Sequence, residues 1–319
     1  MSEKSGRGFS YRLMTQKLRL NGLVVDRETV RYCLKELDPD GVEQRKAHRM
    51  IRRTYRSRGP NFLWHMDGYD KLKPFGFCVH GAIDGYSRKI LWLKVNESNS
   101  DPNIIASYFL DCIEQLKLLP RCIRADRGTE NVVVCGMQRF LRTNEGEITS
   151  SKASFVFGPS TQNQRIEAWW SIFKRTRTTW WINFFKDLCD EGLYDPSVDI
   201  QKKCLQFCFM DFIQNELNET KKLWNSHRIR KTCTAECPSG RPDVLYFANN
   251  EIDCGYVLPN AKVDVCKDLL NDEDAGYNNI HAVSQLCAVL VEENNFEMPS
   301  SVNNAKDLYC NLIRLIEDL

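Results

Sequence analysis

The sequence predicts a mixed α/β core, with a five-stranded sheet flanked by helices. Short apolar runs bounded by turn residues are typical of strands, and five of them occur, at residues 63–66, 76–83, 88–95, 122–125 and 154–157. Between 102 and 118, apolar residues recur at spacings of three and four, which predicts a helix. Three strands followed by alternating helices and strands give a mixed sheet with helices on its faces.

The connections between these elements agree with this order. Asp84-Gly85 joins the second and third strands and suits a tight reversal. A second helix is predicted near 132–141, and the last strand leads through Gly158-Pro159 into a long helix. Apolar residues recur along that helix on one broad face, which we interpret as a core stripe and not as a platform for stacking bases. They are Ile166, Trp169, Trp170, Phe173, Trp180, Trp181, Phe184 and Phe185.

Three carboxylates occupy the ends or starts of these elements. Asp67 and Asp126 each end a strand-like run, and Glu167 lies at the start of the long helix. Carboxylates brought together repel one another unless a cation offsets their charge, and hard cations take oxygen ligands. Two Mg²⁺ or Mn²⁺ ions about 3.5–4 Å apart would clamp the attacking and leaving oxygens of an in-line phosphoryl displacement. We therefore expect the cutting or joining of a nucleic-acid backbone.

Other carboxylates near these motifs are assigned to the fold. Asp70 lies three residues after Asp67, outside the predicted strand. Asp84 is expected to shape the hairpin turn, and Glu130 is expected to pack or to hydrogen-bond within its own turn. The predicted site therefore consists of the three carboxylates alone.

Four motifs occur in register along the predicted core. They are Trp64-His-Met-Asp67, Ile83-Asp-Gly-Tyr-Ser-Arg88, Asp126-Arg-Gly-Thr-Glu-Asn131 and Asn163-Gln-Arg-Ile-Glu167. With them, the chain from about residue 61 to 242 resembles the integrase core domain of the retroviral integrase and DDE transposase superfamily. Similar integrase-like proteins derived from mobile elements share the Gly-Thr-Glu-Asn and Gln-Arg-Ile-Glu-Ala motifs. The resemblance implies an RNase H-like fold.

The resemblance also implies an activity and a partner. Asp67, Asp126 and Glu167 would be the catalytic, metal-binding residues of a DNA strand transferase that nicks and joins DNA ends without a covalent protein intermediate. Gln164 is expected to contact DNA, because its segment resembles a loop that approaches DNA in integrases. Lys174, two turns beyond Glu167, is similar to an integrase lysine, although a lysine in plain solvent remains an alternative. DNA and a second copy of the chain are the expected partners. No small-molecule substrate is expected.

Two other classes of function remain open from the sequence. One is a host-retained DNA-binding or scaffolding protein without catalysis, since catalytic residues can outlive their use. The other is a metal-dependent nuclease without joining activity, which would share the site and differ only in its product. An assay for Mg²⁺-dependent joining separates the three classes.

The formal net charge of +2 conceals a gradient along the chain. Residues 1–60 carry 15 Lys/Arg against 7 Asp/Glu, residues 61–240 carry 24 against 21, and residues 241–319 carry 5 against 14. Contacts of Lys and Arg with phosphates release counterions and drive sequence-independent affinity. Nucleic acid is therefore expected at the basic front of the chain.

Residues 1–44 are predicted to form a helix-turn-helix-like DNA-binding domain. Two short segments with apolar residues at helical spacing flank Asn21-Gly22, and Asp26 suits the cap of the second. Arg27 and Arg31 lie on that second helix and are expected to contact DNA. A small helical cap that packs on the core is the alternative.

Residues 45–60 form a basic linker. Seven Lys/Arg and no acidic residue occur between 45 and 58, and Arg52 and Arg53 are expected to contact DNA phosphates. A solvated helix face and a nuclear localisation signal are the alternatives. Gly59-Pro60 marks the boundary with the catalytic core, residues 61–242.

The C-terminal part is predicted to be a helical appendage. A helix over 205–223 leads into Trp224-Asn-Ser-His-Arg-Ile-Arg230, which resembles the segment that closes many transposase cores. This segment is expected to pack against the catalytic core, and DNA contact through Arg228, Arg230 and Lys231 is the alternative. Residues 243–319 form an acidic, partly helical tail that ends in an amphipathic run at 307–319. This tail reads as an interaction appendage.

Cysteine usage and hydropathy indicate where the protein resides and whether it binds zinc. The 14 cysteines are scattered through apolar segments, which favours reduced, buried thiols. The pairs Cys204/Cys208 and Cys233/Cys237 do not supply the four well-spaced ligands of a structural zinc site, so no zinc is predicted. No run of about 18 apolar residues and no signal region occurs. An intracellular protein is expected, nuclear if eukaryotic, without a membrane partner.

Overall fold

The computed structural model describes residues 11–40, 42, 56–143, 152–231, 237–248, 252–273 and 281–318. The chain divides into two compact units, Met1–Thr54 and Tyr55–Leu319. The predicted contacts at Arg52 and Arg53 lie outside the described residues.

The described part of the first unit includes the helices α1 (Tyr11–Leu20) and α2 (Arg27–Leu37), joined through Asn21-Gly22. The Asp26 carboxylate caps α2 as predicted, because it accepts hydrogen bonds from the backbone N–H groups of Glu28 and Thr29 at 2.9 and 3.0 Å. Met14, Val30 and Leu34 form its small buried cluster. The described part is a capped helix pair with a minimal core.

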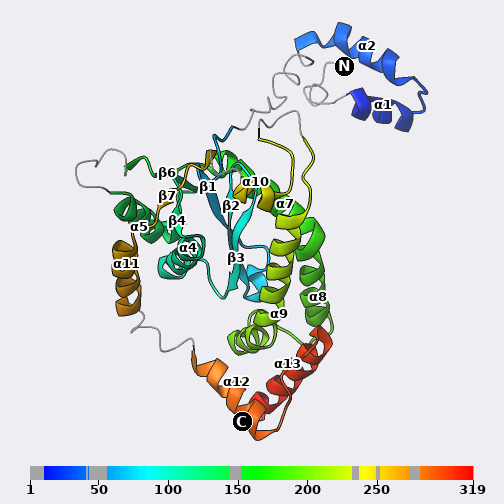
Figure 1. Cartoon of the computed structure of the whole chain (residues 1–319). Coiled ribbons are helices and arrows are strands. Elements are labelled where there is room, and N and C mark those ends of the chain that lie inside the picture. Colours follow the sequence, from blue (N-terminus) through cyan, green and yellow to red (C-terminus); the bar gives the residue numbers. More distant parts are fainter. Residues whose placement is uncertain are drawn as a thin grey trace. The chain divides into compact units, whose positions relative to one another are not determined.

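The second unit is built on a five-stranded sheet in the order β3-β2-β1-β5-β6 (Figure 1). β1, β2 and β3 are antiparallel neighbours, whereas β5 runs parallel to both β1 and β6. The strands are β1 (Trp64–Tyr69), β2 (Cys78–Asp84), β3 (Ile90–Asn96), β5 (Ile123–Ala125) and β6 (Phe155–Phe157). The predicted mixed five-stranded sheet is confirmed.

Helices cover both faces of this sheet (Figure 1). The helices α4 (Pro102–Leu116) and α5 (Val132–Arg142) contribute to the buried cluster on one face. On the other face lie α7 (Gln164–Phe173), α8 (Thr179–Asp190) and α9 (Asp199–Ser226). Between the described elements lie the short 3₁₀ turns η2 (Lys73–Phe75), η3 (Thr129–Asn131) and η4 (Ser160–Gln162).

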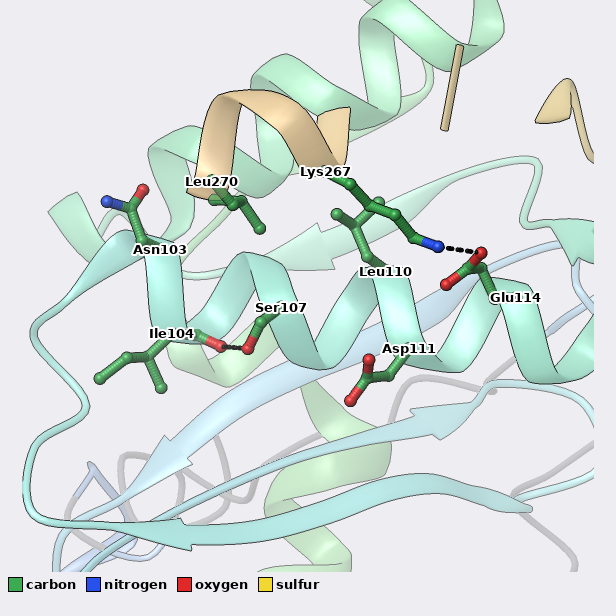
Figure 2. A pocket seen from close by; sticks show the side chains of 8 residues that line it. All are labelled: Asn103, Ile104, Ser107, Leu110, Asp111, Glu114, Lys267 and Leu270. Carbon is green, nitrogen blue, oxygen red and sulfur yellow. Dashed lines mark hydrogen bonds and ion pairs between the residues drawn. The ribbon is translucent and has the colours of Figure 1, made fainter. Parts of the chain in front are cut away.

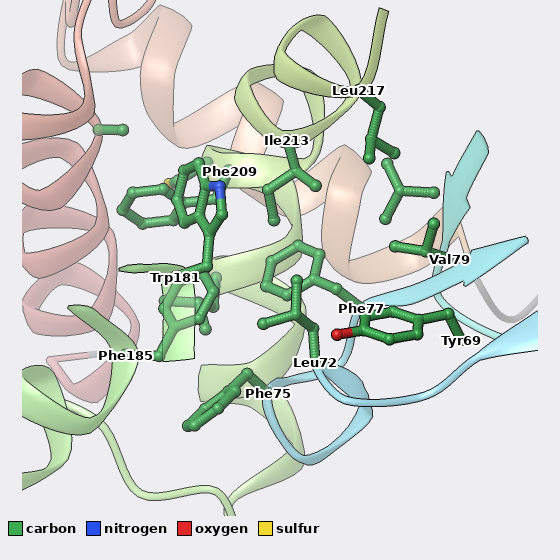
Figure 3. Packing of buried hydrophobic residues seen from close by; sticks show 14 of the residues in the cluster. Tyr69, Leu72, Phe75, Phe77, Val79, Trp181, Phe185, Phe209, Ile213 and Leu217 are labelled. Atoms are coloured by element: carbon green, nitrogen blue, oxygen red, sulfur yellow. The ribbon is translucent and has the colours of Figure 1, made fainter. Parts of the chain in front are cut away.

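An aromatic core joins α8 and α9 to the sheet, as Figure 3 shows. The rings of Phe77 and Phe185 stack with centroids 5.3 Å apart, and Phe209 from α9 meets Phe185 edge-on at 5.7 Å. Aromatic pairs in these geometries add about 0.5–1.5 kcal/mol each beyond their burial. This packing holds the α7–α8 run against the sheet.

A π turn, η5 (Lys174–Thr178), links α7 to α8. Its extra residue shifts the phase of the helix, so that Phe173 before it and Trp181 and Phe185 after it all face the core. Trp180 is left 54% exposed. The prediction that all eight apolar residues share one face is therefore wrong for Trp180, because periodicity alone does not reveal a single inserted residue.

Side chains of α9 cover the outer edge of β3. Gln214 accepts a hydrogen bond from the backbone N–H of Val95 at 3.0 Å and donates to the carbonyl of Leu93 at 3.1 Å. Asn225 likewise accepts from the N–H of Ile90 at 2.8 Å and donates to its carbonyl at 2.9 Å. An uncovered edge strand can pair with other chains, so these amides protect the sheet.

Asn225→Ala is expected to lower the free energy of unfolding by about 2–4 kcal/mol, because it leaves two buried backbone groups of Ile90 without partners. Urea denaturation measures the change. Ser226→Ala is the matched control, since the Ser226 side chain is exposed and its hydroxyl bonds to the carbonyl of Leu223 in its own helix. Equal stability of the two variants would contradict the role given to the covered edge.

The predicted closing segment, Trp224–Arg230, begins in the last turn of α9, and its Trp224 packs on the core, as predicted. The indole N–H of Trp224 donates to the carbonyl of Arg88 at 2.7 Å, and its ring lies 6.2 Å from that of Trp169. The imidazole ring of His227 lies against the same indole, with the ring centroids 4.6 Å apart. The side chains of Arg228, Arg230 and Lys231 are exposed.

The C-terminal region is helical, as predicted. It contains α10 (Pro242–Phe247), α11 (Asn260–Glu273), α12 (His281–Glu293) and α13 (Val302–Glu317). A two-stranded sheet of β4 (Leu118–Leu119) and β7 (Tyr256–Val257) ties this region to the core, and α11 contacts α4 and α5. α12 and α13 pack on α9. Among the helices of the described residues, none has the length and apolar character that crossing a membrane requires.

Candidate active site

Asp67 lies inside the central strand β1, opposite Gly81 of β2. It was expected to end its strand, but Gly68 and Tyr69 continue the pairing with β2, so that expectation is wrong. A central strand is held by neighbours on both sides, and one glycine does not end it. Asp67 is therefore fixed by sheet pairing and not placed on a loop.

The face of β1 that carries Asp67 is turned toward α7. Successive side chains of a strand point to opposite faces, so Trp64 and Met66 enter one core and Tyr69 enters the other. Trp170 of α7 donates a hydrogen bond from Nε1 to Asp67 Oδ2 at 3.0 Å. Tyr69 stacks on the same indole with ring centroids 4.8 Å apart. These contacts set the register of α7 on the strand.

The absence of a side chain at Gly81 makes room for this indole. A Cβ atom there would lie 3.1 Å from Cη2 of Trp170 and 3.2 Å from Cδ1 of Leu93. Both contacts are closer than ordinary van der Waals packing. The glycine thus lets Trp170 lie flat enough against the sheet to reach Asp67.

Asp67 is electrostatically coupled to the other two carboxylates. Burial raises its pKa to about 7, and the charges of Glu167 and Asp126 add to that effect, while the hydrogen bond from Trp170 opposes it. Burial and the charge of Asp126 also raise the pKa of Glu167. The structure therefore brings Asp67, Asp126 and Glu167 close enough for each pair to repel.

Asp126 follows directly after β5 and is held by Asn131. The Asn131 amide donates from Nδ2 to Asp126 Oδ1 at 3.1 Å and to Glu130 Oε1 at 2.8 Å. Asn131 is 2% exposed, so its side chain is fixed in this position. The expectation that Glu130 hydrogen-bonds within its own turn is confirmed.

The absence of a side chain at Gly128 leaves room for the Glu130 carboxylate. A Cβ atom at Gly128 would lie 1.9 Å from Glu130 Oε1, so any larger residue would displace this carboxylate from its place beside Asp126. Burial raises the pKa of Glu130, and the charges of Asp126 and Asp70 raise it further. The Gly-Thr-Glu-Asn sequence thus forms a compact turn that orients Asp126 and places a second carboxylate beside it.

Glu167 lies in the first turn of α7, where the positive end of the helix dipole favours a carboxylate. It lines an open hollow of about 450 Å³ together with Thr161, Gln164, Ala168 and Ser171. Gln164 is exposed, and it shares this hollow with Glu167. The two side chains can therefore meet the same bound molecule.

The three carboxylates match a hard divalent cation in donor chemistry, because carboxylate oxygens are its preferred protein ligands and a cation would relieve their mutual repulsion. Among the described residues, no three His, Cys, Asp or Glu side chains are placed so that they could hold a metal ion. Mg²⁺ commonly takes only one or two carboxylates and completes its coordination with water and substrate phosphates. Oxygen donors of this kind therefore suit Mg²⁺ or Mn²⁺, with water or substrate phosphates completing the coordination.

A buried amide connects the start of α7 to β1. Asn163, 1% exposed, has Oδ1 2.7 Å from Nδ1 of His65 and donates from Nδ2 to the carbonyl of Met66 at 2.8 Å. Burial lowers the pKa of His65 to about 3, so its ring is neutral and Nδ1 carries the proton given to Asn163. The pair of His65 and Asn163 thus connects β1, which carries Asp67, to the start of α7, which carries Glu167.

The predicted DNA-contacting residues lie in different parts of the chain. Lys174 begins the π turn and is exposed, seven residues after Glu167. Arg27 and Arg31 are exposed on α2 in the first unit, where Arg31 pairs with Glu28 at 3.4 Å.

Two of the acidic residues set aside from the sequence have roles in the fold. Asp84 is fully buried and accepts hydrogen bonds from the backbone N–H groups of Asn61 and Ser87 at 2.8 and 2.7 Å. Burial raises its pKa to about 6. Asp70 accepts from Asn99 Nδ2 at 3.1 Å. Asp84 thus shapes the hairpin turn, as predicted.

A further hollow of about 280 Å³ lies between α4 and α11 (Figure 2). Lys267 and Glu114 form an ion pair of 2.6 Å at its side, and the Ser107 hydroxyl donates to the carbonyl of Ile104. Some polar groups of this hollow thus already bond to other groups of the protein. None of Asp67, Asp126 and Glu167 lines it.

Sequence reasoning missed the residues that hold the carboxylates in place. Trp170 was assigned to the core, although its indole N–H also bonds to Asp67. Asn131 and Asn163 were noted only as parts of motifs. The period of two along β1 could have placed His65 beside Asp67, but which helix residue faces it depends on tertiary packing.

Comparison with known proteins places the chain in a family. The family model described as "Integrase core domain" matches residues 54–242. Among solved structures, the catalytic core domain of HTLV-2 integrase in complex with magnesium, in its trimeric form, is 17% identical over 60% of this chain and 99% of that chain, with a TM-score of 0.33. The dimeric form has the same identity and coverage and a TM-score of 0.31. A search of curated proteins finds no match.

The family assignment rests on the family model, which covers more than half of the chain. The matched range spans β1, the turn with Asp126 and the start of α7 with Glu167. The sequence motifs and the family model thus point to one conclusion. The chain belongs to the integrase core domain family.

Proposed function

We propose that this protein is a DNA strand transferase of the integrase and transposase type, which nicks DNA ends and joins them to other DNA. The observation that carries the proposal is the coupling of Asp67 to both Asp126 and Glu167 in a member of the integrase core family. A carboxylate such as Asp67, whose pKa is strongly raised by burial and by two neighbouring carboxylates, is typical of catalytic sites.

The proposed site would use two Mg²⁺ or Mn²⁺ ions held by Asp67, Asp126 and Glu167. When bound, such ions supply a charge that activates the attacking oxygen and stabilises the leaving oxygen. Among the chain's own groups, Trp170 orients Asp67 and Asn131 orients Asp126 through the hydrogen bonds described above. These partners hold the carboxylates before substrate arrives, which reduces the reorganisation that the reaction requires.

The surroundings of the site would bind the DNA. Gln164 shares the hollow of Glu167 and is suited to contact a DNA end, and Lys174 offers an exposed cation farther along the same helical run. Arg27 and Arg31 on α2 and the basic linker with Arg52 and Arg53 would add phosphate contacts. Joining two ends would bring at least two copies of the chain together.

The test is an oligonucleotide joining assay with and without Mg²⁺. Asp126→Asn is expected to reduce the joining rate by about 10³-fold or more, since the transition-state stabilisation lost is several kcal/mol. Asp187→Asn, an exposed carboxylate of α8, is the matched control and should join at the wild-type rate.

The products of the same assay decide between the classes. Mg²⁺-dependent joining that Asp126→Asn abolishes supports the proposal. Cutting without joining would make the protein a nuclease. If wild type neither cuts nor joins, a non-catalytic DNA-binding protein is the remaining reading.

A further inference from the structure

We propose that Asn163 and His65 form a positioning latch that fixes the start of α7, and with it Glu167, relative to the strand that carries Asp67. The latch rests on the proposed function, because it gives Glu167 its place in the carboxylate site. Neither residue touches substrate in this proposal, so both are positioning residues.

Asn163 occupies the position immediately before α7, but its side chain does not cap the helix. An asparagine at this position usually accepts a hydrogen bond from the first turn of the helix. Here the amide is turned toward β1 and buried, with both of its ends bonded there. The helix thus gives up a capping bond, and the strand gains two contacts.

The strand partners of Asn163 lie next to Asp67. His65 and Met66 are the two residues that precede it, and both are fully buried. The pairing of β1 with β5 ends at His65, opposite Arg124, and Asn163 bonds to the carbonyl of the next residue. The amide therefore continues the hydrogen bonding of β1 where β5 stops.

The helix partner of Asn163 is Glu167 itself. The backbone N–H of Glu167 donates to the carbonyl of Asn163 at 3.2 Å, which makes Glu167 the first residue of α7 to bond back to the latch. One residue thus links the strand of Asp67 to the helical turn of Glu167. A shift at Asn163 passes directly to the spacing of the two carboxylates.

Other contacts keep the helix start docked without the latch. Arg124 donates from Nη1 to the carbonyl of Gln162 at 3.2 Å, and Arg165 donates from Nε to the carbonyl of Gly85 at 3.1 Å. Trp169 and Trp170 remain buried against the sheet. Loss of the latch should therefore disturb the position of Glu167 while the fold is kept.

Direct Mn²⁺ binding to the full chain, measured by electron paramagnetic resonance, tests the latch without relying on activity. Asn163→Ala is expected to weaken Mn²⁺ binding by about 10- to 100-fold, the usual effect of removing a group that orients a metal ligand. His65→Phe keeps a buried, planar ring that is somewhat larger than imidazole, removes the N–H, and should weaken binding in the same direction.

Asn225→Ala is the matched control. Asn225 of α9 is also a buried asparagine with two hydrogen bonds to a strand, but its partner is Ile90 of the edge strand β3. It should lose stability in the same way as Asn163→Ala and keep the wild-type affinity for Mn²⁺. Equal Mn²⁺ affinity in Asn163→Ala and Asn225→Ala would overturn the latch.

Two further variants separate this proposal from the proposed function. Glu167→Gln should lose Mn²⁺ binding; if it binds as wild type does, the carboxylate site itself is wrong. If Glu167→Gln loses binding while Asn163→Ala and His65→Phe keep it, only the latch is refuted. If Asn163→Ala does not fold, His65→Phe decides: weakened binding supports the latch, and wild-type affinity overturns it.

Discussion

Asp67→Asn is expected to stabilise the protein in the absence of divalent cations at pH 8. Burial and the charges of Glu167 and Asp126 raise the pKa of Asp67 to about 7 in the folded chain, whereas an unfolded aspartate titrates near 3.8. The folded state therefore holds a proton that the unfolded state has released between these two values. Stability falls as the pH rises through this range, and the full penalty is present above pH 7.

The size of this effect follows from the shift. A difference of about three pKa units corresponds to about 4 kcal/mol, which sets the upper end of the expected gain in Asp67→Asn at pH 8. Thermal unfolding in the presence of EDTA should show a midpoint several degrees higher than that of wild type. At pH 5 the gain should be less than half as large, because pH 5 lies only about one unit above the pKa of the unfolded aspartate.

Asp187→Asn is the control for the unfolding measurements on Asp67→Asn. Asp187→Asn changes an exposed carboxylate of α8 and should leave the unfolding midpoint within about 1 °C of wild type at both pH values. A midpoint of Asp67→Asn equal to or below that of wild type at pH 8 would mean that Asp67 is not under electrostatic stress. The same variant should lose Mg²⁺-dependent joining, so stability and function would change in opposite directions.

Mn²⁺ binding is expected to weaken by about tenfold for each pH unit below 7. A cation binds the deprotonated carboxylate, so below its pKa of about 7 Asp67 must release a proton for each ion bound. Above pH 8 the affinity should level off, because the proton has already left. Calorimetric titration in buffers of different ionisation enthalpy measures both the affinity and the number of protons released.

The variant Asp67→Asn provides the control for this pH dependence. The residual Mn²⁺ affinity of that variant should change little between pH 6 and 8, since the titrating group is gone. A wild-type affinity that is constant over the same range would show that Asp67 does not bind the ion or that its pKa is not raised.

The elements of the core could be predicted from the sequence because their signals are local. The apolar runs and the helical spacing between 102 and 118 depend on a few neighbouring residues, and α4 and the five strands appear close to where they were expected. The π turn at Lys174–Thr178 was missed, since an inserted residue becomes visible only when the two flanking helices pack on one core.

The carboxylates of the site could be chosen from motifs, but their surroundings could not. Asp67, Asp126 and Glu167 stood out through their motifs and through their expected places at the ends or starts of elements, although Asp67 lies inside β1. Their partners Trp170 and Asn131 depend on how α7 docks on β1 and how the Gly-Thr-Glu-Asn turn folds. The space above Gly81 is another such feature, since it has meaning only beside the indole of Trp170. Such contacts join residues far apart in the chain, and one sequence carries no direct signal of them.

The titration of the Asp67 carboxyl, followed by carbon-13 NMR in metal-free protein, tests most directly whether the three carboxylates meet. The expected apparent pKa is about 7 in wild type. In the double variant Asp126→Asn, Glu167→Gln it should fall clearly, while burial still holds it above 3.8. An Asp67 pKa that is the same in wild type and in the double variant would contradict a shared site and, with it, the proposed chemistry.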